Sequence, residues 1–149
     1  MPDDFAEPGR AAPLHLLKMA VGIADLEDLR RVRAARRLER GGSWVYTRNR
    51  PRRAEEVLAG GSIYWVIRGH VRVRQPVTGF RIERDENGRP YCLIEVDETL
   101  VPTLWRPWRP FQGWRYLTVA DAPPDRLDGG DGELPTAGML AELRALGLI

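Results

Sequence analysis

The middle of the chain, Ile63 to Arg74, reads Ile-Tyr-Trp-Val-Ile-Arg-Gly-His-Val-Arg-Val-Arg. Its first five residues are an unbroken β-prone apolar run, which is typical of a buried strand. Its last four alternate between valine and arginine, so Val71 and Val73 share one face of a second strand. Gly69 predicts a bulge or bend between the two. This segment therefore predicts a β-sheet at the centre of the fold.

The sheet is expected to continue on the C-terminal side as a hairpin. Residues 80–84 alternate again, and Asp85-Glu86-Asn87-Gly88 contains Asn-Gly, a strong hairpin signal, before the apolar run 91–96. Together these runs predict a meander of three or four antiparallel strands. Residues 101–112 include three prolines, so we expect neither a helix nor a central strand there. Residues 113–118 predict one more strand.

The N-terminal side adds strands and two helices. Residues 14–21 predict a buried strand, and Asp25 is placed as the N-cap of a helix that runs to about Leu38. Gly41-Gly42 ends that helix, and residues 43–47 form a short strand. Pro51 fits the first turn of a second helix that reaches Ala59. On the first helix, arginines continue the apolar face, so its C-terminal half is a basic ridge or the helix ends earlier.

These elements predict an α+β fold with a mixed, mostly antiparallel, barrel-like sheet of five or six strands. Two helices flank the sheet, and Thr136 caps a short C-terminal helix with a leucine stripe. We expect a flexible tail over 1–13, one globular domain over 14–125, and an acidic linker and helix over 126–149. We expect the C-terminal helix to dock on the body of the domain, on a partner or on a second copy of the chain, forming a homodimer.

Positive charge is concentrated in one part of the chain. Residues 30–74 contain 13 arginines and 3 acids, a net +10, while the whole chain is +2, so the remainder sums to −8. Clustered arginines among aromatic rings suit recognition of phosphates and bases. A bias toward arginine in the composition, with one lysine in the chain, is the alternative explanation. The predicted phosphate ligands are Arg48, Arg50, Arg52, Arg53, Arg72 and Arg74.

The segment WRPWRPFQGWR, residues 105–115, is the most unusual local composition. Tryptophan beside arginine on a proline-stiffened loop offers a stacking surface for a base. The alternative is a loop that folds over the sheet with its tryptophans in the core. The candidate stacking or pocket residues are Trp65, Trp105, Trp108, Trp114 and the amide Gln112.

Signals for catalysis are few. His15 and His70 lie far apart, with no carboxylate or thiol at motif spacing, and the common hydrolase, P-loop and dinucleotide motifs are absent. Glu95 and Asp97 share a strand face and could do acid–base work, but a solvated strand end explains them as well. We predict no catalytic residue, no metal site and no cofactor. Cys92, the single cysteine, is expected to be buried.

Three motifs, LHLLK (14–18), GGSIYWVIRG (60–69) followed by Arg74-Gln75, and RPFQGWRY (109–116), resemble an uncharacterised alphaproteobacterial family of about this length. That family is known as a domain of unknown function and implies no catalytic residues. The order of elements is also similar to the PUA-like superfamily. This second resemblance implies a small, partly open β-barrel that binds RNA or modified bases, although the G-x-K-x-x-E-x-R signature of its ASCH members is absent.

The sequence therefore predicts a nucleic-acid-binding protein, with RNA or a modified nucleotide favoured as the ligand. A small enzyme acting on a nucleotide-like anion through Glu95 or Asp97, and a protein-interaction module, are the alternatives. The N-terminus lacks the apolar core of a secretory signal, and no apolar run approaches the roughly 20 residues that span a bilayer. We therefore expect a cytoplasmic protein that does not enter a membrane.

Overall fold

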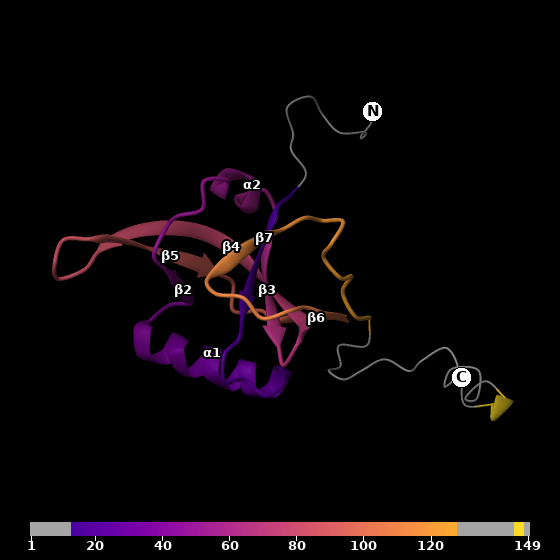
Figure 1. Cartoon of the computed structure of the whole chain (residues 1–149). Coiled ribbons are helices and arrows are strands. Elements are labelled where there is room, and N and C mark those ends of the chain that lie inside the picture. The colour runs from indigo at the N-terminus through magenta and orange to yellow at the C-terminus, as the bar shows by residue number, and fades with distance from the viewer. Residues whose placement is uncertain (1–12, 128–144, 148–149) are drawn as a thin grey trace.

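A computed structural model describes residues 13–127 and 145–147 of the chain (Figure 1). The predicted N-terminal tail, apart from Pro13, lies outside the described residues. So does the predicted C-terminal helix, apart from residues 145–147. No helix among the described residues is both long enough and apolar enough to cross a membrane.

Seven strands and two helices make up the described fold. The strands are β1 (His15–Met19), β2 (Trp44–Thr47), β3 (Ser62–Ile67), β4 (His70–Arg84), β5 (Pro90–Val96), β6 (Val101–Pro107) and β7 (Trp114–Leu117). The helices are α1 (Leu26–Arg40) and α2 (Ala54–Leu58). The mostly-sheet architecture with two helices agrees with the sequence prediction.

The strands form one mixed sheet in the order β2-β5-β4-β3-β1-β7, with β6 paired to β4 off this path. The β1–β3 pair is parallel and the other pairs are antiparallel. The prediction of a mixed, mostly antiparallel sheet is confirmed, but the sheet has seven strands rather than five or six. It is also not a closed barrel, because β2 and β7 end the strand order without pairing to each other.

Strand β4 connects the two parts of this sheet. The sequence predicts separate strands over residues 71–74 and 80–84, whereas the structure has one strand of 15 residues. Its first half pairs with β3 and β6, and its second half pairs with β5 after a register shift between Val77 and Gly79. Gly69, with φ 82°, lies in the tight turn between β3 and β4 rather than in a bulge.

Both faces of the central strands are covered. Leu16, Ile63 and Trp65 belong to a core that also includes Leu26 and Leu29 of α1. On the opposite face, Leu17, Tyr64 and Val66 pack with Trp108 and Phe111 of the proline-rich segment. Strand β3 is buried at every position, which explains its unbroken apolar run. Cys92 is buried, as predicted.

Local sequence signals set the ends of α1. The Asp25 side chain accepts a hydrogen bond from the Asp28 backbone N–H at 2.8 Å, and Gly41 ends the helix in the left-handed conformation. Helix α2 is shorter than predicted, since residues 52–53 form a turn before Ala54. In Figure 1 the two helices lie at opposite ends of the sheet.

Candidate nucleic-acid interface

The arginines before α2 are partly neutralised by that helix. Arg50 forms an ion pair with Glu55 at 3.2 Å, and Arg53 pairs with Glu56 through two contacts of 2.7 Å. The hydrogen bond from Arg53 lowers the pKa of the Glu56 carboxyl. Arg52 is exposed in the turn. A helix of five residues supplies little dipole, so this predicted phosphate site has less positive potential than its sequence suggests.

Two other predicted phosphate ligands hold the sheet together. Arg72 is 8% exposed, donates from Nε to the Ile67 carbonyl at 2.9 Å, and lies 3.8 Å from the Trp105 ring centroid. Arg74 forms two bonds of 2.8 Å to the Asp125 carboxylate. That pairing lowers the pKa of Asp125. Both guanidinium groups therefore have structural partners.

Of the five predicted stacking or pocket residues, three line two adjoining pockets and two lie elsewhere: Trp65, Gln112 and Trp114 are in the first group, and Trp105 and Trp108 in the second. Trp65 is 5% exposed and donates its indole N–H to Gln75 at 3.2 Å, so it offers no open ring face. Trp105 contacts Arg72 and His70, and Trp108 packs on the second core beside Arg106. The positions of these two tryptophans agree with the alternative interpretation of residues 105–115, in which the segment folds over the sheet. Trp114 and Gln112, in contrast, line a common pocket.

That pocket lies where the two open ends of the sheet approach each other. Its volume is about 410 Å³, and it is lined by residues of β2 and β7 together with Lys18 of β1. A second pocket, of about 280 Å³, continues between α1, β1 and β2, and the two share Lys18 and Tyr46. We call the combined space the seam cleft.

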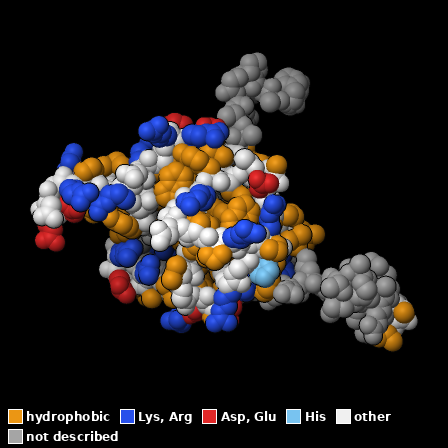
Figure 2. Space-filling model, viewed as in Figure 1, with side chains coloured by type: hydrophobic (Ala, Val, Ile, Leu, Met, Phe, Trp, Pro, Cys, Tyr) orange, Lys and Arg blue, Asp and Glu red, His pale blue; other side chains and the backbone are white. Residues whose placement is uncertain are grey.

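Cations dominate the polar lining of the seam cleft. The six are Lys18, Arg33, Arg36, Arg40, Arg48 and Arg115, and none of the described residues that line the cleft is acidic. Figure 2 shows basic side chains spread among hydrophobic patches on the face in view. Lys18, Arg36, Arg40 and Arg115 form no ion pair with any described residue, whereas Arg48 lies 3.9 Å from Asp85.

The charges within the seam cleft are poorly compensated. Burial lowers the pKa of Arg33 to about 10, with the neighbouring charges of Arg36 and Arg40 adding to the effect. Burial also lowers the pKa of Lys18. The Arg33 guanidinium donates to the Trp44 carbonyl at 2.9 Å, but its Nε is buried with no partner among the described residues. An anion in the cleft would supply the missing compensation.

Tyr46 is the exposed aromatic residue at the junction of the two pockets. It is 48% exposed, and its ring centroid lies 5.4 Å from that of Tyr91. Trp114 lines the wider pocket and packs edge-on against Tyr116. The seam cleft thus combines cations with three aromatic residues, of which Tyr46 and Trp114 are accessible and Trp65 is nearly buried.

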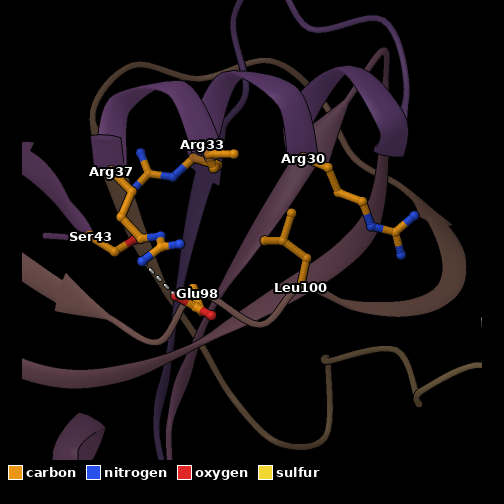
Figure 3. A pocket seen from close by; sticks show the side chains of 7 residues that line it. Arg30, Arg33, Arg37, Ser43, Glu98 and Leu100 are labelled. Carbon is orange, nitrogen blue, oxygen red and sulfur yellow. Dashed lines mark ion pairs between the residues drawn. The ribbon is translucent and has the colours of Figure 1, made fainter. Parts of the chain in front are cut away.

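A separate pocket occupies the neighbouring face of α1 (Figure 3). It has a volume of about 240 Å³ and is lined by Arg30, Arg33, Ala34, Arg37, Ser43, Glu98 and Leu100. Arg37 forms an ion pair with Glu98 at 3.1 Å across it. We call this the helix pocket. Arg33 lines both the helix pocket and the seam cleft.

The site residues predicted from the sequence did not include six that line the cleft: Lys18, Arg33, Arg36, Arg40, Tyr46 and Arg115. The signal for two of them was present, because a basic ridge on the C-terminal half of the first helix was one of its two interpretations. The helix does extend to Arg40, and Arg36 and Arg40 are exposed. Lys18 and Arg115 could not be found in this way, because β1 and β7 meet only in the folded sheet.

The candidate acid–base pair stands apart from both pockets. The Asp97 side chain accepts a hydrogen bond from the Thr99 backbone N–H at 2.8 Å, as in a turn. Neither Glu95 nor Asp97 lines the seam cleft or the helix pocket. Within the described part of the chain, no group of three or more histidine, cysteine or acidic residues could hold a metal ion.

Fold and site together define a small α+β protein with an open mixed sheet and a basic cleft at its seam. The chain belongs to the DUF1489 family of proteins of unknown function, whose model matches residues 16–149. No curated protein and no solved structure matches it.

Proposed function

We propose that the protein binds nucleic acid, with RNA favoured, in the seam cleft. The observation that carries this proposal is that the described residues lining the cleft include six cations and no acid. Phosphate contacts supply most of the sequence-independent affinity of nucleic-acid-binding proteins. An elongated cleft with this charge suits a polyanionic strand better than a single small anion.

The basic residues are distributed along the whole length of the cleft. Arg36 and Arg40 project from successive turns of α1, and Arg115 and Lys18 lie on the paired strands β7 and β1. The residues before α2, which the sequence favoured, have acidic neighbours instead. We therefore assign the principal phosphate contacts to Lys18, Arg36, Arg40 and Arg115, with Arg48 at the edge.

The cleft suits a single-stranded ligand, whose unpaired bases can stack on its aromatic rings. Tyr46 and Trp114 present aromatic rings among the cations, and bases of single strands stack on such rings with little sequence preference. Pockets of about 280 and 410 Å³ are too small for a duplex. The resemblance to PUA-like proteins supports RNA by analogy alone. An alphaproteobacterial source and a cytoplasmic location belong to this proposal as well.

The test compares two triple variants that remove the same charge. Binding of labelled single-stranded RNA, tRNA and duplex DNA is measured by fluorescence anisotropy at two salt concentrations. Arg36→Ala, Arg40→Ala and Arg115→Ala together change the seam cleft. Arg50→Ala, Arg52→Ala and Arg53→Ala together are the matched control.

We expect the wild type to bind single-stranded RNA with an affinity that falls as salt rises. The seam variant should bind this RNA at least about tenfold more weakly. The control variant should retain most of the affinity, and duplex DNA should bind more weakly. Equal losses in both variants would indicate diffuse attraction rather than a cleft. The absence of binding to any probe at low salt would contradict the proposal.

A further inference from the structure

The helix pocket differs from the seam cleft in shape and in charge. It is compact, at about 240 Å³, and two of its lining residues, Ala34 and Leu100, are apolar. Its charged residues are three arginines and one glutamate, a net +2 (3 − 1). Figure 3 shows α1 above the pocket, with Glu98 and Leu100 on the opposite side.

Arg33 is the most constrained of the three arginines. The residue is 7% exposed, and its buried Nε has no hydrogen-bond partner among the described residues. Its guanidinium donates to the neutral carbonyl of Trp44 and lies over the Trp65 ring, 5.9 Å from the ring centroid, so both contacts are with uncharged groups. A buried charge without a counterion is costly, and this one forms a wall of the pocket. Its field favours an anion there.

A carboxylate already occupies part of this position. Glu98 reaches from the β5–β6 connection to Arg37 at 3.1 Å, and both side chains are exposed, at 63% and 49%. Exposed ion pairs contribute little stability, so an external anion can replace this one at low cost. Arg30 is similarly paired with an exposed acid, Glu27, which lies outside the pocket lining.

We propose that the helix pocket binds a small phosphate monoester, whose head group takes the place of Glu98 on Arg37. Once Glu98 is displaced, the three arginines of the lining carry +3, and a phosphate monoester brings nearly two negative charges at neutral pH. Guanidinium groups hold phosphate oxygens through paired hydrogen bonds. The Ser43 hydroxyl can donate another, and Leu100 and Ala34 offer contact to a short organic group.

The size of the pocket limits the ligand. Pockets for drug-sized molecules begin at roughly 300 Å³, and this one is smaller. A phosphodiester in a chain has one charge per phosphate and two substituents, so it fits this pocket less well than a terminal phosphate does. The proposal is therefore independent of nucleic-acid binding in the seam cleft.

The test measures binding of inorganic phosphate and glycerol 3-phosphate by isothermal titration calorimetry, with glycerol as the uncharged comparison. Glu98→Gln removes the competing carboxylate, and Arg37→Gln removes the ligand contact. Arg31→Gln is the matched control, because Arg31 lies on the same helix, pairs with Asp28 and lines neither cavity. The thermal unfolding of each variant is recorded beside its binding.

We expect Glu98→Gln to tighten glycerol 3-phosphate binding by about tenfold and Arg37→Gln to weaken it by about tenfold. Arg31→Gln should stay within about twofold, and glycerol should not bind. Equal binding of the two phosphates would indicate that the organic group makes no contact and would overturn the monoester assignment. Failure of both the wild type and Glu98→Gln to bind phosphate would overturn the site.

Nucleic-acid binding separates the two proposals. The seam triple variant should bind glycerol 3-phosphate as the wild type does while losing RNA. Loss of both ligands in that variant would place the phosphate in the seam cleft and contradict a separate pocket. The Nε–H NMR signal of Arg33, assigned with Arg33→Lys, should shift on phosphate binding.

Discussion

Gln75 is a fully buried amide at the point where three strands meet. Its side chain accepts from the Trp65 indole at 3.2 Å and donates to the Asp97 carbonyl at 2.8 Å. We predict that Gln75→Leu destabilises the protein by about 2 kcal/mol, because the buried Trp65 indole N–H loses its acceptor and the part-buried Asp97 carbonyl loses a donor. Urea unfolding gives the free energy.

Gln112→Leu provides the control for this substitution. Gln112 is exposed, so the same change there should alter the free energy of unfolding by less than about 0.5 kcal/mol. Similar losses at the two positions would mean that the buried amide has no special role. Gln75 was absent from the sequence-based site, since a glutamine next to Pro76 gives no sign of burial.

The junction between α2 and β3 depends on a single glycine. A Cβ at Gly61 would lie 2.1 Å from the Leu14 carbonyl oxygen and 2.7 Å from that of Val57. Both atoms belong to the backbone, so neither can move without shifting β1 or α2. We predict that Gly61→Ala costs about 3 kcal/mol or more of stability, measured by urea unfolding.

Gly88→Ala tests whether the contact, rather than glycine itself, is responsible. Gly88 has φ 78° and no atom within 4 Å of the added Cβ. Backbone conformation alone should cost about 1 kcal/mol there. A Gly61→Ala variant as stable as Gly88→Ala would contradict the close approach of these elements.

Local patterns in the sequence predicted most elements but not how they combine. The N-cap Asp25, the Asn-Gly hairpin and the apolar runs indicated α1, the β4–β5 hairpin and β3 near their observed positions. The proline-rich segment was harder, because Val101–Pro107 pairs with β4 on one side and has only an isolated bridge, Thr103 to Asp125, on the other, so prolines are tolerated there. Helix α2 begins later than predicted, at Ala54, and its N-cap residue, Arg53, forms no side-chain cap.

The excess of positive charge could be predicted from the composition, whereas the ion pairs that neutralise individual arginines could not. The sequence located the excess of arginine, but only the fold pairs Arg74 with Asp125 and leaves Arg36 and Arg40 without an ion pair among the described residues. The antiparallel pairing of β1 and β7 sets Lys18 opposite Trp114 at the seam, and no local pattern specifies that contact. Whether the cleft binds nucleic acid stays a prediction.

The salt dependence of RNA binding measures the whole cleft at once. For single strands, the logarithm of the association constant falls with the logarithm of salt concentration by about 0.7 per phosphate contact. Six cations line the cleft, so we predict a slope of up to about −4 for the wild type. The seam triple variant should reduce that slope by about 2, because three contacts are lost.

Tyr46→Leu separates stacking from charge in the same titration. Loss of one stacked base weakens binding by about 1–3 kcal/mol. The slope should stay that of the wild type, since no phosphate contact changes. A flatter slope in Tyr46→Leu would mean that the ring positions the cations instead of a base. The counterions released on binding come from the phosphates that the protein neutralises. An unchanged slope in the triple variant would therefore show that the RNA strand lies elsewhere on the molecule.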